Sequence, residues 1–200
     1  AEIEFTGSEG GEVPVWIAAY GPKALQAAGR HGDGLILQLA DPWLVDWFSQ
    51  QARAARAEAG LDPADFRVMA AAPVWVSDDL AQGRAQIRWV PAMVGNHVAD
   101  LVEKYGKTGQ AVPQRLTDYI AGRKGYDYKH HADKDADHLD FISDDIVDSF
   151  GVNGPVAAHV EKLEELRRIG VTQFNIYLMC GDEERIVEAY GQHVIPALKG

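Results

Sequence analysis

Apolar residues in this chain form short continuous runs that alternate with longer amphipathic segments. The first run covers residues 15–20 and is followed by Gly21 and Pro22. Helical spacing of apolar residues then continues as far as Gly32, and a second apolar run occupies residues 35–39. Short apolar runs are typical of strands buried on both faces, and Pro is tolerated at the first position of a helix. The pattern therefore predicts a strand–helix–strand unit with a glycine turn at each junction.

Two further apolar runs, at residues 66–76 and 171–179, predict two more strands. Four strands separated by amphipathic segments predict an α/β fold. Asp41 precedes Pro42 and is a predicted helix N-cap. The remaining helices are predicted over residues 42–59, 77–90, 94–105, 113–122, 144–150, 155–169 and 182–195.

The turn that joins the first strand to its helix has a possible chemical role. A helix that starts at Gly21 and Pro22 leaves free backbone amides at its N-terminus, and these attract anions, above all phosphate. The alternative is an ordinary turn in which the glycine only eases the change of direction. Spacing alone favours the ordinary turn, because short motifs are weak evidence.

Three segments of the chain resemble one protein family. The sequence PVWIAAYGPKALQAAGRHGDGLIL, residues 14–37, resembles the middle segment of luciferase-like monooxygenases, the bacterial-luciferase superfamily. The resemblance is strongest to the branch that uses a deazaflavin, coenzyme F420, in place of FMN. A deazaflavin-type subgroup of the family is similar to the sequence WVPAMVGNHVADLVEKYG. The closing helix and last strand of the family are similar to the sequence GPVAAHVEKLEELRRIGVTQFNIYL.

This resemblance implies a (β/α)8 TIM-barrel family fold, of which residues 1–200 form a single domain. The four predicted strands match the fifth to eighth strands of the family, so the chain resembles the C-terminal half of the barrel. A helical insertion at about residues 93–150, before the last strand, would lie over the barrel mouth. A complete barrel of this type needs about 250 residues, and a half barrel has two open sheet edges. We therefore expect a homo-oligomer, or pairing with a missing N-terminal half.

The resemblance also implies where a cofactor and a substrate bind. In the family the loop after the fifth strand binds the cofactor phosphate, and the corresponding residues are Ala19, Tyr20, Gly21, Pro22 and Lys23. Gln38 closes an otherwise apolar strand, so we expect it to face the substrate at the barrel mouth. Trp75 is a second substrate candidate that either flanks a flat ring or packs in the core. Arg123 is a third, which holds an anionic group or is plain surface.

A polar segment at residues 125–141 is rich in histidine and allows several interpretations. His130 and His131 lie near acidic residues, but no helix imposes the spacing of metal ligands, so a solvated loop is favoured over a metal site. Tyr126, His130 and His131 are the weak catalytic candidates, because a histidine can move the proton that accompanies hydride transfer. The alternative is a loop without chemistry, and the catalytic residue stays unassigned.

Composition narrows the classes of partner. The net charge of −11 lacks the basic footprint of a nucleic-acid-binding protein, so we expect no nucleic-acid partner. No apolar run approaches the roughly 20 residues of a membrane span, so we expect no membrane partner. Cys180 is the only cysteine, which excludes an internal disulfide and fits a cytoplasmic location.

These observations lead to one expected function and two alternatives. We expect an oxidoreductase of the luciferase-like class that transfers a hydride between coenzyme F420 and a small organic substrate. The first alternative is an FMN-dependent monooxygenase of the same superfamily. The second is a half barrel without catalysis that serves as a binding or assembly module.

Overall fold

The computed structural model describes residues 13–91, 94, 116–118 and 142–199. Their strands are all parallel and form one sheet. The strands are β1 (Trp16–Ala18), β2 (Gly34–Leu37), β3 (Arg67–Val76), β4 (Val152–Gly154) and β5 (Gln173–Tyr177). The helices are α1 (Pro22–His31), α2 (Pro42–Glu58), η1 (Pro63–Asp65), α3 (Leu80–Ile87), α6 (Asp144–Phe150), α7 (Val156–Arg168), α8 (Glu183–Ala189), the π-helix η3 (Tyr190–Val194) and α9 (Ile195–Lys199).

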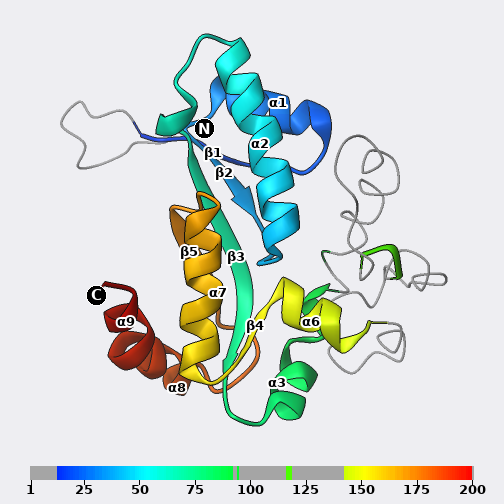
Figure 1. Ribbon diagram of the computed structural model, residues 1–200, viewed down its shortest axis with the longest axis vertical. Helices are drawn as coiled ribbons and strands as arrows, with labels where there is room; N and C mark the ends of the chain where they lie inside the picture. The colour runs from blue at the N-terminus through cyan, green and yellow to red at the C-terminus, as the bar shows by residue number, and fades with distance from the viewer. Residues whose placement is uncertain (1–12, 92–93, 95–115, 119–141, 200) are drawn as a thin grey trace, which may run out of the picture.

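Strand β3 is the longest strand and the one that joins the others. It pairs with β2 and β5 through its first part and with β4 through Val74, Trp75 and Val76. Pairing with β5 ends at Pro73, which has no N–H to donate. Figure 1 shows β1, β2, α1 and α2 beside the N-terminal end of β3, and α3, α6 and α8 around its C-terminal end. The C-terminal ends of parallel strands are where barrel active sites form.

The exposure of the strands follows their position in the sheet. Every residue of β3 except Arg67 is buried. Trp16 and Ile17 of β1 are only half-buried and Ala18 is exposed, so the prediction that residues 15–20 are buried on both faces is wrong. The reason is that β1 is an outer strand, which pairs only with β2 within the described part of the chain. Strand β5 is likewise an outer strand, and two of its residues, Gln173 and Asn175, are exposed.

The sequence predicted most of the described helices, with some errors at their ends. The Asp41 carboxylate caps α2 by accepting from the Leu44 N–H at 2.9 Å, as expected from the Asp-Pro pair. The short strand β4 was not predicted, because three residues carry too little periodicity. The predicted end of the last helix before Pro196 is wrong, since α9 contains this proline. Its first turn tolerates a residue that lacks an N–H.

Helices α1 and α2 pack closely because α1 has a glycine at their contact. A Cβ atom built on Gly29 would lie 2.1 Å from the backbone oxygen of Ala52 and 3.0 Å from the backbone nitrogen of Arg56. These neighbours are backbone atoms, which cannot rotate away as a flexible side chain can. Gly29 therefore sets the distance between the two helices that flank β1 and β2.

We expect Gly29→Ala to lower the free energy of unfolding by about 1–3 kcal/mol, the usual cost of overpacking. Urea unfolding followed by circular dichroism measures this change. Gly191→Ala in η3 is the matched control, because nothing lies within 4 Å of its Cβ position. The control is expected to be neutral or to stabilise the protein by up to about 1 kcal/mol, as alanine usually does in a helix. Equal losses in both variants would contradict the packing argument.

Candidate functional site

The turn between β1 and α1 leaves an unpaired helix N-terminus. Gly21 is the N-cap residue in an extended conformation, with φ −77° and ψ 152°, and no side chain caps it. Its carbonyl accepts from the Leu25 N–H at 2.9 Å, which closes the first helical turn. Within the described residues, the backbone N–H groups of Lys23 and Ala24 have no acceptor. These N–H groups and the exposed Lys23 side chain form an end that can bind an anion.

The structure brings two of the predicted site residues together. The backbone N–H of Gln38 donates to the hydroxyl of Tyr20 at 2.6 Å. The Tyr20 ring meets the Phe48 ring edge to face, with centroids 5.5 Å apart. Burial raises the pKa of Tyr20, so its hydroxyl stays protonated. Ala19 is buried in the core, so its side chain contributes packing, whereas Gln38 is exposed beyond the end of β2.

Helix α6 is anchored at the C-terminal end of β2, a contact that sequence reasoning missed. The Ala40 N–H donates to the backbone oxygen of Phe150 at 2.9 Å. The fully buried carboxylate of Asp41 accepts from the Ser149 hydroxyl through its second oxygen, while its first oxygen caps α2. These bonds connect positions about a hundred residues apart. No local pattern signals them, except that a capping Asp has a second oxygen available.

Trp75 lies in the C-terminal part of β3 and is only 6% exposed. The guanidinium carbon of Arg185, from α8, lies 5.2 Å from the centre of its ring. On another side a Cβ atom at Gly83 of α3 would lie 2.9 Å from Trp75 Cδ1. The ring is therefore enclosed by α3 and α8. Of the two interpretations of Trp75, this surrounding favours packing in the core.

A buried histidine links α7 to the same part of β3. His159 is fully buried, with Nε2 3.2 Å from the backbone oxygen of Trp75 and Nδ1 2.9 Å from the Tyr190 hydroxyl. A carbonyl oxygen can only accept, so Nε2 carries the proton and Nδ1 accepts from Tyr190. Burial lowers the pKa of His159 and keeps the ring neutral. The pattern of residues around His159 predicted no role for it.

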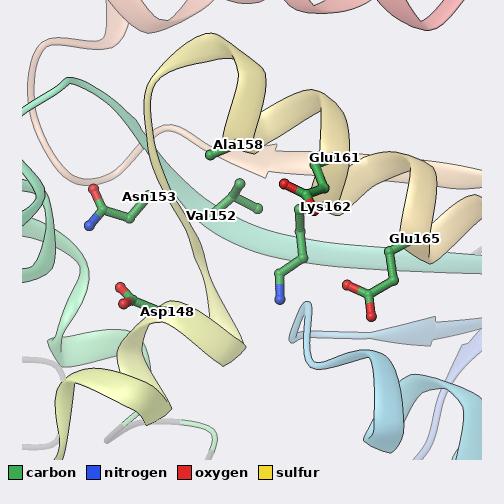
Figure 2. A pocket seen from close by; sticks show the side chains of 7 residues that line it. All are labelled: Asp148, Val152, Asn153, Ala158, Glu161, Lys162 and Glu165. Carbon is green, nitrogen blue, oxygen red and sulfur yellow. The ribbon is translucent and has the colours of Figure 1, made fainter.

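A pocket between α6, β4 and α7 is acidic. Its volume is about 220 Å³, and Figure 2 shows Lys162 extending between Asp148 and Glu165. Figure 2 labels all of its lining residues, which are Asp148, Val152, Asn153, Ala158, Glu161, Lys162 and Glu165. The lining carries three carboxylates and one ammonium, and Arg84 pairs with one of the carboxylates, that of Asp148. The remaining negative charge disfavours an anionic cofactor here. In the described ranges, no group of three or more His, Cys, Asp or Glu residues could hold a metal ion.

Four of the predicted site residues lie outside the described residues. These are the weak catalytic candidates and the cationic substrate candidate, namely Tyr126, His130, His131 and Arg123. The described parts of the predicted insertion are residue 94, residues 116–118 and residues 142–150.

Among the helices of the described residues, none is long and apolar enough to cross a membrane.

Comparison with known families agrees with this architecture. The family model described as luciferase-like monooxygenase matches residues 4–173 of this chain. The chain therefore belongs to the luciferase-like monooxygenase family, which confirms the resemblance found in its sequence.

Two curated relatives are similar to nearly the whole chain. The 5,10-methylenetetrahydromethanopterin reductase of Archaeoglobus fulgidus is 29% identical over 196 residues, which cover 96% of this chain and 57% of the relative. The protein of the same name from Methanopyrus kandleri is 26% identical over 203 residues, which cover 100% of this chain and 54% of the relative. The chain thus spans a little over half the length of the curated relatives it matches.

Solved structures confirm the predicted fold class. The coenzyme F420 dependent tetrahydromethanopterin reductase from Methanopyrus kandleri matches with a TM-score of 0.66 and 22% identity, over 93% of this chain and 51% of that chain. An F420-dependent secondary alcohol dehydrogenase in complex with an F420-acetone adduct matches with a TM-score of 0.68 and 20% identity, over 96% of this chain and 50% of that chain. The fold is that of the TIM-barrel enzymes of this family.

The buried His159 makes stability depend on pH. An unfolded histidine has a pKa of about 6.5, and the pKa of His159 is lower than this in the folded protein. Below about pH 6.5 the unfolded chain therefore binds a proton that the folded chain does not, and stability falls as the pH falls. We expect His159→Gln to be less stable at neutral pH and to lose less stability on acidification.

Urea unfolding between about pH 5 and pH 8 measures how the free energy of unfolding depends on pH. For one titrating group this dependence reaches at most about 1.4 kcal/mol per pH unit. His31→Gln is the control, because it makes the same substitution at an exposed position on α1. Parallel pH profiles for the wild type and His159→Gln would show that His159 does not carry the effect.

Proposed function

We propose that this chain is part of an oxidoreductase that transfers a hydride between coenzyme F420 and a small organic substrate. The observation that carries the proposal is the pair of unpaired N–H groups, of Lys23 and Ala24, at the start of α1. They lie in the turn to which the sequence resemblance assigns the cofactor phosphate. The relatives named as F420-dependent enzymes support the same cofactor.

The residues present fit a phosphate-bearing cofactor. When bound, F420 supplies the hydride chemistry, and the protein binds and orients it. The two N–H groups and the ammonium group of Lys23 hold the phosphate at the positive end of α1. Gly21 and Pro22 form the turn that exposes these amides, and neither residue places a side-chain acceptor there.

We assign the substrate to the side of the mouth where β2 ends. Gln38 is the exposed polar residue at this point, and its amide side chain can donate and accept hydrogen bonds. Arg123 stays a candidate for an anionic group of the substrate, and Tyr126, His130 and His131 stay candidates for proton transfer. The enclosure of Trp75 by α3 and α8 supports a role in holding β3 rather than in touching the substrate.

FMN is the alternative cofactor, and the same turn would suit it. FMN also carries a phosphate, and a riboflavin lyase with modified FMN shares the fold with a TM-score of 0.55. An FMN-dependent monooxygenase therefore remains the second candidate function. A half barrel without catalysis is the third, and failure to bind either cofactor would favour it.

We further propose that residues 1–200 form the C-terminal part of a TIM barrel in the cytoplasm, and that the chain forms a homo-oligomer or pairs with a missing N-terminal half. Both outer strands have one unpaired edge within the described residues. An apolar pocket of about 360 Å³ lies beside β5, between α7 and the helices that end the chain. Exposed apolar side chains gather near the two outer strands, and these are Val13, Val15, Leu178, Met179, Val187 and Ile195. Pairing would bury them.

The first test measures binding of F420 and of FMN to the chain by fluorescence titration. We expect F420 to bind, and Lys23→Glu to weaken its binding by about tenfold, because the change replaces an attraction to phosphate by a repulsion. Lys199→Glu in α9 is the matched control with the same change of charge, and it is expected to bind as the wild type does. Equal binding by both variants would contradict the proposed phosphate site, and tighter binding of FMN would favour the monooxygenase.

The second test concerns association of the chain. Light scattering after gel filtration is expected to give a mass above that of one chain, because the open strand edges and apolar side chains favour pairing. Ile195→Lys places a charge beside the apolar pocket and is expected to shift the protein towards the monomer. Leu61→Lys, at an apolar position of similar exposure away from the outer strands, is the control. A monodisperse wild-type monomer would contradict self-association.

A further inference from the structure

Tyr20 connects the proposed phosphate turn to the proposed substrate side. The residue lies between β1 and Gly21, one residue before the N-cap of α1. Its hydroxyl accepts from the backbone N–H of Gln38, which is the first residue after β2. The two ends of this hydrogen bond are 18 residues apart in the chain. A single side chain thus joins the two segments to which cofactor and substrate are assigned.

The hydrogen bond replaces a contact that a longer strand would make. The β1–β2 ladder consists of three pairs and ends at Ala18 and Ile36. Beyond it, the Gln38 N–H is satisfied by a side chain instead of a strand carbonyl. A tyrosine hydroxyl lies at the far end of a long side chain, so the backbone at Tyr20 and at Gln38 can stand further apart than paired strands do.

The position of the Tyr20 ring is itself fixed. Its edge-to-face contact with Phe48 joins it to a fully buried residue of α2. Helix α2 begins at Pro42, shortly after Gln38, so the ring is held by the element that follows the backbone it supports. Burial raises the pKa of Tyr20, and the neutral hydroxyl keeps one proton to donate while it accepts from Gln38.

We propose that Tyr20 is a positioning residue that couples the phosphate turn to the backbone of Gln38, so that an anion bound at α1 orders the substrate side of the mouth. This inference rests on the proposed function and adds to it a connection between the two sites. A displacement of Tyr20 moves the acceptor of the Gln38 N–H, and the rigid ring leaves few other ways to absorb the displacement. The effect on substrate is indirect, through Gln38.

Amide hydrogen exchange in the chain, followed by NMR, tests the coupling. Tyr20→Phe keeps the ring on Phe48 and removes only the hydroxyl, so the Gln38 amide is expected to exchange about tenfold faster. Tyr190→Phe is the control, because it removes a buried tyrosine hydroxyl whose hydrogen-bond partner is His159 and not Gln38. The control is expected to leave exchange at Gln38 unchanged.

Addition of F420 then separates the coupling from the cofactor site. In the wild type, F420 is expected to slow exchange at Lys23, Ala24 and Gln38. In Tyr20→Phe it is expected to slow exchange at Lys23 and Ala24 only. Equal protection of Gln38 by F420 in both proteins, or unchanged exchange of Gln38 in Tyr20→Phe without ligand, would overturn the coupling and leave the proposed function intact. No protection at Lys23 and Ala24 in the wild type would overturn both.

Discussion

The backbone hydrogen bonds of β3 are the constraint on which the other described elements depend. This strand pairs with β2, β4 and β5, and it is buried along nearly its whole length. Buried peptide groups must be paired, so the neighbours of β3 cannot move away without a large cost in free energy. Even the carbonyls at its C-terminal end have partners, since His159 donates to Trp75 and Arg185 donates to Val76.

The proposed site lies at the ends of β1 and β2, where the sheet is less constrained. Strands β1 and β2 have three ladder pairs between them, and β1 has one open edge within the described residues. Short outer strands of this kind hold a site in place only with support from other groups. Tyr20 and Asp41 provide such support, because each ties the end of a strand to a residue of another segment. The chain spans a little over half the length of its curated relatives.

Charged side chains hold α3 and α6 together at the C-terminal end of the sheet. Arg84 pairs with Asp148 and Asp144, and Arg88 pairs with Asp144 and donates to the backbone oxygen of Ile142. Single exposed ion pairs contribute little, but shared carboxylates in a network fix geometry better than isolated pairs do. Favourable contacts with two arginines lower the pKa of Asp144. The network holds the start of α6 close to α3, and Ser149 then connects α6 to Asp41.

The sequence by itself determined the order of four of the five described strands and of most described helices, the cap of α2 by Asp41 and the helix start at Gly21 and Pro22. These features depend on residues within one or two turns of each other, so local periodicity and capping chemistry are sufficient to predict them. The family, too, could be found from the sequence, because its motifs are continuous segments. The exposure of β1 could not, since a run of apolar residues is the same whether its strand has one neighbour or two.

Only the tertiary structure decided which side chains bond to which distant groups near the C-terminal ends of the strands. Tyr20 meets Gln38 across 18 residues, His159 meets Trp75 across 84, and Ser149 meets Asp41 across 108. Each of these contacts satisfies a buried or partly buried polar group, and the choice of partner depends on how the strands are arranged in space. The distance between two residues along the chain does not predict these contacts. Parallel strands bring their ends together whatever the length of the segments between them.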